Sequence, residues 1–174
     1  MAILSVRKYG DPLLRRRARP VDQVTPELRT MIANMTDTMY DEVGIGLAAP
    51  QVGISLRLIV LADEGGRGVQ ALLNPAIIEQ GGEVTAEEGC LSIPGVFAEV
   101  TRAAWVKVEA RDVDGNLVAI TARGLRARVL QHEIDHLDGI LFIDRVDPMT
   151  RDRIKRKIKK EGLREDASRH AFAL

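Results

Sequence analysis

Two histidines and a glutamate between residues 132 and 136 have the types and the spacing of a metal-binding site. His132 and His136 are four positions apart and Glu133 follows the first, which gives the pattern His-Glu-x-x-His. Residues four apart on a helix lie one turn apart on the same face, so both imidazoles can hold one ion. Glu133 would lie beside that ion and handle a proton. A chance match, in a helix with two core histidines, is the plain alternative.

The residues around this motif favour a helix over 125–138. A glycine precedes the segment, Asp-Gly follows it, and no proline interrupts it. Helical periodicity places Leu125 and Val129 on the side of the two histidines. The opposite side is apolar and carries Ala127, Leu130, Ile134 and Leu137. A helix with one apolar side and one ligand-bearing side is expected at the centre of the fold.

Two histidines leave such a site without its third protein ligand. One known solution places a histidine six residues beyond the second, but Phe142 stands there. Another takes a glutamate from a later helix, and the candidates, Glu161 and Glu165, lie in a basic tail. The remaining solution is a soft ligand, and Cys90 is the single cysteine. A lone cysteine is more often a small buried apolar residue, but beside an incomplete two-histidine site we favour Cys90 as a ligand.

Length and composition fit one domain with its own core, over residues 1–174. The single cysteine excludes an internal disulfide. No apolar run approaches the length of a membrane span, and the first residues lack a signal-peptide pattern. We therefore expect a cytoplasmic protein with no membrane partner. No internal repeat or long linker divides the chain.

Periodicity and turn residues predict one further helix and several strands before the ligand helix. Thr25 and Pro26 should begin the helix and Gly44 should end it. Residues 44–53 are rich in glycine and, taken alone, read as a tight loop. The expected strands cover residues 57–62, 69–78, 84–92, 99–111 and 117–121, with a turn at 93–95. We expect an α+β fold, with antiparallel strands packed around the central metal-binding helix and a helix near the C-terminus.

This last helix is predicted over 148–160, with Asp147 as its cap. Between residues 151 and 164 there are eight lysines and arginines against two acidic residues, although the whole chain has a formal net charge of zero. The plain interpretation is a solvated amphipathic helix. Residues 161–174 are expected to form a flexible tail.

Three segments resemble, in the same order, the three motifs of the peptide deformylases. They are residues 44–53 (GIGLAAPQVG), 88–92 (EGCLS) and 131–136 (QHEIDH). Three motifs in order are far more specific than His-Glu-x-x-His alone, and the resemblance runs nearly the whole length of the chain. It implies a hydrolase that removes the N-formyl group from the N-terminal formylmethionine of nascent polypeptides.

The resemblance implies that Cys90, His132 and His136 bind one divalent metal, with water as the fourth ligand. Family members use Fe(II) natively, and Zn(II), Ni(II) or Co(II) can replace it. The ligand types themselves indicate only a borderline-soft transition metal.

The resemblance also assigns the catalytic groups. Glu133 would take a proton from water and deliver it to the leaving amine. Gln51 and the backbone N–H of Leu91 would hold the developing oxyanion. Gly46 would bind substrate through its backbone. Without the resemblance, Gln51 reads as a loop-capping amide.

We expect the peptide to lie extended beside residues 44–47, with an apolar pocket for its first side chain. Four residues are expected to line this pocket: Ile45, Leu125, Val129 and the ring of His132. Some relatives carry an apolar residue in place of Arg128 and an arginine in place of Phe97, so the pocket rim and the outer contacts can differ. Glu88 and Asp135 are candidates to orient the ligating imidazoles, or else are surface carboxylates.

Three other functions compete with this one. A zincin-type endopeptidase would use the same helix, but the ligand set differs. A structural metal site would close with four protein ligands, and we find only three. Cys90 could instead be a nucleophile paired with His132. As a further partner, the resemblance implies the ribosome, which the basic stretch between Arg151 and Lys160 would contact through phosphates. We expect no sequence-specific nucleic acid.

Overall fold

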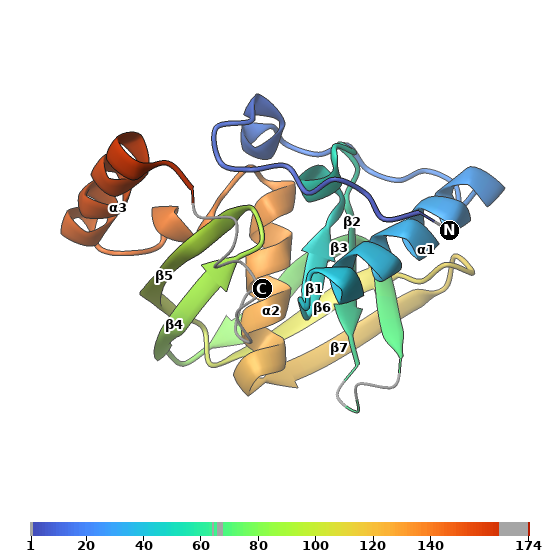
Figure 1. Ribbon diagram of the computed structural model, residues 1–174. Helices are drawn as coiled ribbons and strands as arrows, with labels where there is room; N and C mark the ends of the chain where they lie inside the picture. The colour runs from blue at the N-terminus through green and yellow to red at the C-terminus, as the bar shows by residue number, and fades with distance from the viewer. Residues whose placement is uncertain (1, 64, 66–67, 164–173) are drawn as a thin grey trace.

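The largest layer is a five-stranded antiparallel sheet, seen behind the other elements in the computed structural model (Figure 1). The structure describes residues 2–63, 65, 68–163 and 174. The strand order is β1-β2-β3-β6-β7, and β1 is therefore an edge strand. The strands are β1 (Gly46–Ala48), β2 (Leu58–Ala62), β3 (Val69–Gly81), β6 (Trp105–Arg111) and β7 (Leu117–Arg123).

Strand β3 bends at Asn74, which directly precedes Pro75. Asn74 has a φ of 52°, and the register with β6 shifts between Leu73 and Ala76. Asparagine tolerates this left-handed conformation better than most residues. Its side-chain amide also pairs with both backbone groups of Val21, at 2.8 Å each. The bend therefore fastens the N-terminal segment to the sheet.

A second sheet contains only β4 (Val84–Cys90) and β5 (Ile93–Arg102), paired antiparallel. The register shifts between Gly89 and Cys90, so that Cys90 lies opposite Ile93 after a very tight connection. Strand β5 begins at Ile93, where the sequence predicted a turn over 93–95. That prediction was wrong because β4 already ends at Cys90 and the reversal takes only two residues.

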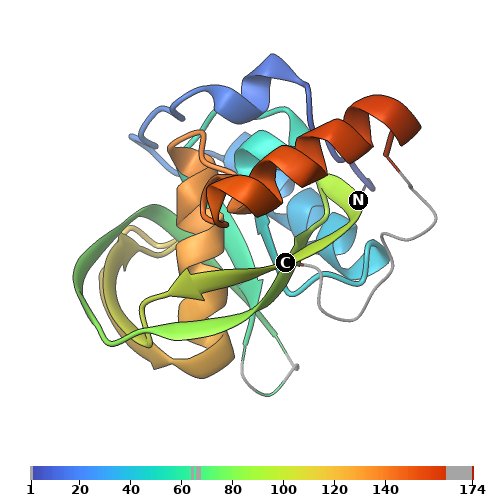
Figure 2. The same ribbon diagram turned by 90° about the vertical axis from the view of Figure 1, so that its left-hand side faces the viewer.

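Helix α2 (Gly124–Leu137) lies between the two sheets (Figures 1 and 2). Its predicted apolar side packs on the larger sheet, in a cluster that includes Ile59, Leu72 and Val108. The other side is buried as well, since every residue from Ala127 to Leu137 is buried. Burial of both sides of a 14-residue helix leaves its polar side chains dependent on protein partners.

Two further helices pack on the outside. Helix α1 (Pro26–Asp41) begins as predicted, with the Thr25 hydroxyl accepting from Leu28 N–H, and packs through Met35 and Met39. Helix α3 (Pro148–Glu161) is capped by Asp147 and buries only Ile154. Short 3-10 turns cover Pro12–Arg15, Ala49–Val52 and Phe142–Asp144. None of the helices among the described residues combines the length and the apolar character needed to span a bilayer.

The predicted α+β class, with antiparallel strands around a central helix and a helix near the C-terminus, is confirmed. The glycine-rich segment 44–53 is not a plain loop, because it contains β1 and a 3-10 turn. The structure differs from the flexible tail predicted over 161–174 at two residues. Glu161 ends α3 and Leu174 is buried, while residues 164–173 lie outside the described residues.

Candidate metal centre and active site

The two histidines of α2 and the cysteine at the end of β4 come together. The Nε2 atoms of His132 and His136 are 3.2 Å apart, and Cys90 Sγ lies 3.5 Å from His136 Nε2. One ligand atom from each residue lies within 4.8 Å of the other two. Cys90 precedes His132 by 42 positions and His136 by 46, yet the three side chains converge on one point. Cys90 thus supplies the third ligand that the two-histidine motif lacked.

Two glycines allow this convergence. A Cβ on Gly89, beside Cys90, would lie 2.4 Å from the ring of Phe97 on β5. A Cβ on Gly46 in β1 would lie 2.9 Å from Val129 and 3.0 Å from Cγ of Glu133. Real Cβ atoms do not approach so closely, so both strands need glycine to pass at this distance.

Burial shifts the pKa values of two of the three ligand side chains, Cys90 and His136. Burial, with the nearby carboxylates of Glu133 and Glu88, raises the pKa of the Cys90 thiol to about 12. Burial, together with the proximity of His132, lowers the pKa of His136 well below its ordinary value. His136 is therefore a neutral imidazole, and a cation beside Cys90 would favour the thiolate.

Glu133 is fully buried on the same turn of α2, with Oε1 3.9 Å from His132 Nε2. Neither carboxylate oxygen has a hydrogen-bond partner among the residues that the structure describes, and the same is true of His136 Nδ1. Burial raises the pKa of Glu133 well above its usual range. An unpaired buried carboxylate beside three converging ligand atoms indicates a site for water and a cation.

Glu88 contacts an imidazole as the sequence suggested. Its Oε1 lies 2.9 Å from His132 Nδ1, and this contact leaves His132 Nε2 directed at the metal position. Burial alone would raise the pKa of Glu88, but hydrogen bonds from His132 and Arg102 lower it to about 2. Glu88 is therefore an ionised, fully buried carboxylate.

Asp135 does not contact an imidazole, which corrects the sequence-based suggestion. It accepts from Arg102 Nη1 at 2.9 Å and from Arg145 Nη2 at 2.9 Å. The physical reason is helical geometry. Asp135 precedes His136 on α2 and is rotated by about 100° from it, toward the two arginines. Asp135 thus acts on the site only through Arg102, which in turn holds Glu88.

Gln51 caps the local backbone through its oxygen and faces Cys90 and Ser92 through its nitrogen. Its Oε1 accepts from Ala48 N–H at 3.0 Å, which caps the 3-10 turn. Its Nε2 donates to Ser92 Oγ at 3.1 Å and lies 3.6 Å from Cys90 Sγ. The amide nitrogen therefore faces the metal position while its oxygen fixes the local backbone.

The backbone at Leu91 is engaged by the last described residue. Leu91 N–H donates to Leu174 O at 3.2 Å, and Leu174 N–H donates to Gly89 O at 3.1 Å. Leu174 is 2% exposed and packs in the same apolar cluster as Val129. An extended main chain can therefore pair with the segment next to Cys90.

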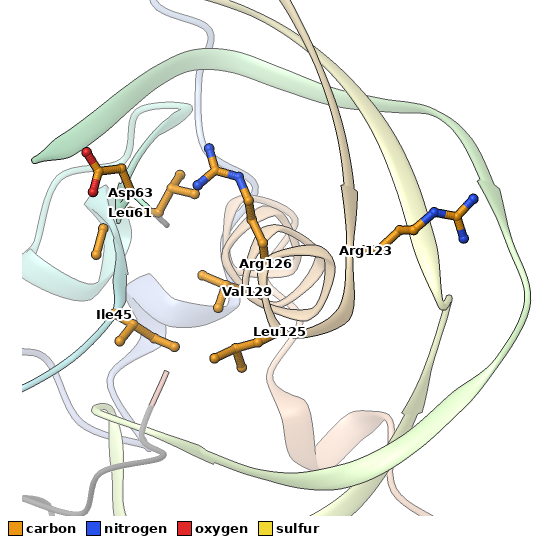
Figure 3. A pocket seen from close by; sticks show the side chains of 8 residues that line it. Ile45, Leu61, Asp63, Arg123, Leu125, Arg126 and Val129 are labelled. Atoms are coloured by element: carbon orange, nitrogen blue, oxygen red, sulfur yellow. The ribbon is translucent and has the colours of Figure 1, made fainter. Parts of the chain in front are cut away.

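Three of the four expected pocket residues line one cavity of about 350 Å³ (Figure 3). Figure 3 shows Ile45, Val129 and Leu125 directed toward one another, with Asp63 and Arg126 at the other end. His132 is not among its lining residues. The ring of His132 instead stacks on Phe142, with centroids 6.3 Å apart. Phe142 thus supports an imidazole at the position where a related motif has a third histidine.

Sequence reasoning missed three polar residues of this site: Arg102, Ser92 and Arg145. Each lies outside the helix motif, and each has a role that depends on contacts across different elements. Arg102 is the most important, since it donates to Glu88 from Nε and Nη2 at 2.6 and 2.9 Å. The only signal in the sequence was an arginine at an inward-facing strand position, which is rare without a carboxylate partner.

The fold and the site together define an α+β protein with a buried Cys-His-His metal-binding cluster and an adjacent carboxylate. The family model "Polypeptide deformylase" matches residues 3–152. The peptide deformylase of Halothermothrix orenii is 51% identical over 146 residues, covering 84% of this chain and 95% of the relative. That of Desulfitobacterium hafniense is 50% identical and covers 87% and 99%.

Solved structures of peptide deformylases match this fold. The peptide deformylase of Legionella pneumophila matches with a TM-score of 0.86 and 46% identity, covering 91% of this chain and 95% of that one. The Synechococcus elongatus peptide deformylase in complex with actinonin matches with a TM-score of 0.85 and 42% identity, covering 94% and 90%. The chain belongs to the polypeptide deformylase family, and the predicted resemblance is confirmed.

Proposed function

We propose that this enzyme hydrolyses the N-formyl group of the N-terminal formylmethionine of nascent polypeptides and releases formate. The observation that carries the proposal is the convergence of Cys90, His132 and His136 beside the unpaired, buried carboxylate of Glu133. Family membership supplies the substrate class. On this proposal residues 1–174 form one catalytic domain that acts in the cytoplasm, where formylated chains are made.

The donor atoms fit one divalent metal ion. One thiol and two imidazoles, with one ligand atom from each within 4.8 Å of the others, form a three-ligand set that leaves a position for water. This set suits a borderline-soft transition metal. We propose Fe(II) as the native ion, with Zn(II), Ni(II) or Co(II) as substitutes. When bound, such an ion is a Lewis acid that makes water nucleophilic at neutral pH.

Glu133 is proposed as the proton-transferring residue. Its carboxylate is buried, unpaired among the described residues, and 3.9 Å from a ligand imidazole. The raised pKa brings it closer to neutrality, where a group can both accept and return a proton. Glu133 would take a proton from the attacking water and give it to the amine that leaves.

Two donors are proposed to hold the oxyanion that forms on the formyl oxygen when water adds to the formyl carbon. Gln51 Nε2 lies 3.6 Å from Cys90 Sγ and is fixed by the contacts of the same side chain with Ala48 and Ser92. Leu91 N–H follows Cys90 directly and already donates to a main-chain carbonyl. Preorganised donors of this kind typically contribute about 3–4 kcal/mol each to transition-state stabilisation.

The substrate backbone is proposed to extend the larger sheet at β1. This strand is an edge, and Gly46 places its backbone directly over Glu133. Main-chain pairing is independent of side-chain identity and so suits a broad set of polypeptides. The cavity of Ile45, Leu125 and Val129 would take the methionine side chain.

Formate release from formyl-Met-Ala by anaerobically purified enzyme, with metal content measured on the same sample, tests the proposal. Chelation should abolish turnover, and added metal should restore it. Glu133→Gln should lose turnover and keep the metal. Hydrolysis of internal peptide bonds in place of formyl release would indicate an endopeptidase.

A cysteine nucleophile makes a different prediction. Turnover that survives complete metal removal and is lost on alkylation of Cys90 would favour that mechanism. A purely structural metal would leave formyl release absent in the loaded enzyme. The metal-loaded and the metal-free enzyme, assayed side by side, therefore distinguish a metal-dependent deformylase, a cysteine-dependent enzyme and a protein with a purely structural metal.

We also propose that α3 contacts ribosomal RNA phosphates. Its exposed side chains include Arg153, Lys155, Arg156, Lys157, Lys159 and Lys160. Only Ile154 is buried, so these charges can change without disturbing the core. Arg156→Glu with Lys159→Glu should weaken co-sedimentation with ribosomes at low salt. Unchanged co-sedimentation would contradict this contact.

A further inference from the structure

Arg128 of α2 is a buried arginine with three protein acceptors. Its side chain is 7% exposed, and arginine is rarely buried to this degree without charge pairing. Nη1 donates to Glu88 Oε2 at 2.5 Å and to Val100 O at 2.9 Å, and Nη2 donates to Val84 O at 2.7 Å. From the sequence, Arg128 was expected at the rim of the substrate pocket rather than in contact with Glu88.

The contact with Glu88 determines which oxygen meets the imidazole. Oε2 accepts hydrogen bonds from Arg128 and from Arg102 Nε, so both guanidinium groups bind this oxygen. Oε1 accepts from Arg102 Nη2 and lies 2.9 Å from His132 Nδ1. Without Arg128, Glu88 would have only the planar pair with Arg102. Arg128 approaches from a different element and so fixes the carboxylate against rotation.

The two carbonyl contacts connect separate parts of the metal site. Val84 and Val100 belong to β4 and β5, the two-stranded sheet that delivers Cys90. Arg128 belongs to α2, which delivers both histidines. One guanidinium therefore links the thiol-bearing sheet, the histidine-bearing helix and the carboxylate that orients His132.

We propose that Arg128 is a positioning residue that sets the affinity of the Cys90-His132-His136 site for its metal, acting through Glu88. The inference rests on the proposed function in one respect, namely that these three residues hold a metal. Arg128 touches neither a ligand atom nor the substrate cavity. The competing explanation is a structural tie that acts through Val84 and Val100 alone.

The first experiment measures Zn(II) affinity by chelator competition for the wild type, Arg128→Met and Arg128→Lys. Loss of a group that orients a ligand typically weakens metal binding by about 10- to 100-fold, and we expect Arg128→Met to fall in this range. Arg128→Lys keeps the charge but not the fork geometry, so it should recover part of the affinity. The absorption spectrum of the Co(II)-loaded protein should shift in Arg128→Met, because His132 is less firmly oriented.

Arg57→Met is the matched control. Arg57 is also partly buried and also reaches α2, donating to Leu137 O at 3.0 Å, but it pairs with Asp138 rather than with Glu88. Its loss should lower thermal stability and leave the Zn(II) affinity within about twofold of the wild type. If Arg57→Met weakens Zn(II) binding as much as Arg128→Met does, the inference is overturned, because the loss of any arginine contact with α2 would then lower the affinity.

A double-mutant cycle with Glu88→Gln separates the two routes. If Arg128 acts through Glu88, Arg128→Met should change the affinity by less than about twofold in the Glu88→Gln background. If Arg128→Met weakens Zn(II) binding as much in the Glu88→Gln background as in the wild type, the contacts of Arg128 with Val84 O and Val100 O are responsible. Wild-type protein without Zn(II) affinity would refute the proposed metal site itself, whereas equal affinity in wild type and Arg128→Met would refute only this inference.

Discussion

The backbone N–H of Leu91 donates to the carbonyl oxygen of Leu174 at an N···O distance of 3.2 Å. This N–H is one of the two donors proposed for the substrate oxyanion, so it cannot serve Leu174 and a formyl oxygen at once. The side chain of Leu174 is buried in the cluster that contains Val129, a residue of the proposed substrate cavity. If Leu91 and Val129 bind substrate as proposed, Leu174 and the substrate must compete for the same backbone and apolar contacts.

Replacing Leu174 by aspartate should lower KM, because a charged side chain does not remain in an apolar cluster. The contacts of Leu174 with Leu91 and with the cluster of Val129 would reduce the fraction of enzyme that can bind substrate, and release of Leu174 should lower KM about three- to tenfold at unchanged kcat. Steady-state kinetics on formyl-Met-Ala measure both constants. Met149→Asp, at a residue that is 80% exposed on α3, is the control and should alter neither. An unchanged KM in Leu174→Asp would show that Leu174 leaves its buried position beside Leu91 freely.

Metal removal should lower the melting temperature as well as abolish turnover. The three ligand atoms come from β4 and α2, so an ion that binds them stabilises the folded state alone. At a free metal concentration about 1,000 times Kd, this linkage amounts to about 4 kcal/mol. Thermal denaturation with and without chelator measures the effect. Cys90→Ala should show no difference between the two conditions, because one ligand is gone.

The ligand helix, its buried position and the third ligand could be predicted because each rests on residue type and local spacing. His132 and His136 specify a helix face by themselves, and the absence of any other thiol specifies Cys90. Relationships between elements could not be predicted in this way. Arg102 and Arg128 meet Glu88 from β5 and α2, and no local pattern encodes that meeting. Asp135 was misplaced for the same reason, since its neighbours in space are arginines distant from the motif.

Acid should destabilise the metal-free enzyme through Glu88. Burial opposes ionisation, but hydrogen bonds from His132 and Arg102 hold the pKa near 2, compared with 4.5 when unperturbed. A lowered pKa in the folded state contributes stability above about pH 4.5, and this contribution is lost as the pH falls toward 2. The shift corresponds to about 3 kcal/mol at most.

Urea denaturation of the metal-free wild type and Glu88→Gln, between pH 6 and pH 3, measures this contribution. The difference in free energy of unfolding between the two proteins should shrink as the pH falls, because Gln does not titrate. A difference that stays constant across this range would contradict an ionised Glu88.

Gly46→Ala should reduce catalysis more than stability. The new methyl group would lie 2.9 Å from Val129 Cγ1 and 3.0 Å from Glu133 Cγ, so either β1 or the Glu133 carboxylate must shift. Because β1 is an edge strand, it can move outward without breaking the sheet. A misplacement of about 1 Å at reacting groups can cost about 100-fold in rate, and we expect kcat/KM to fall at least tenfold. Retained Zn(II) affinity together with this fall would locate the damage at Glu133 and the proposed peptide-binding edge, because the three atoms nearest the new methyl belong to Val129 and Glu133. Wild-type kinetics in Gly46→Ala would contradict a catalytic role for Glu133 at the close passage of β1.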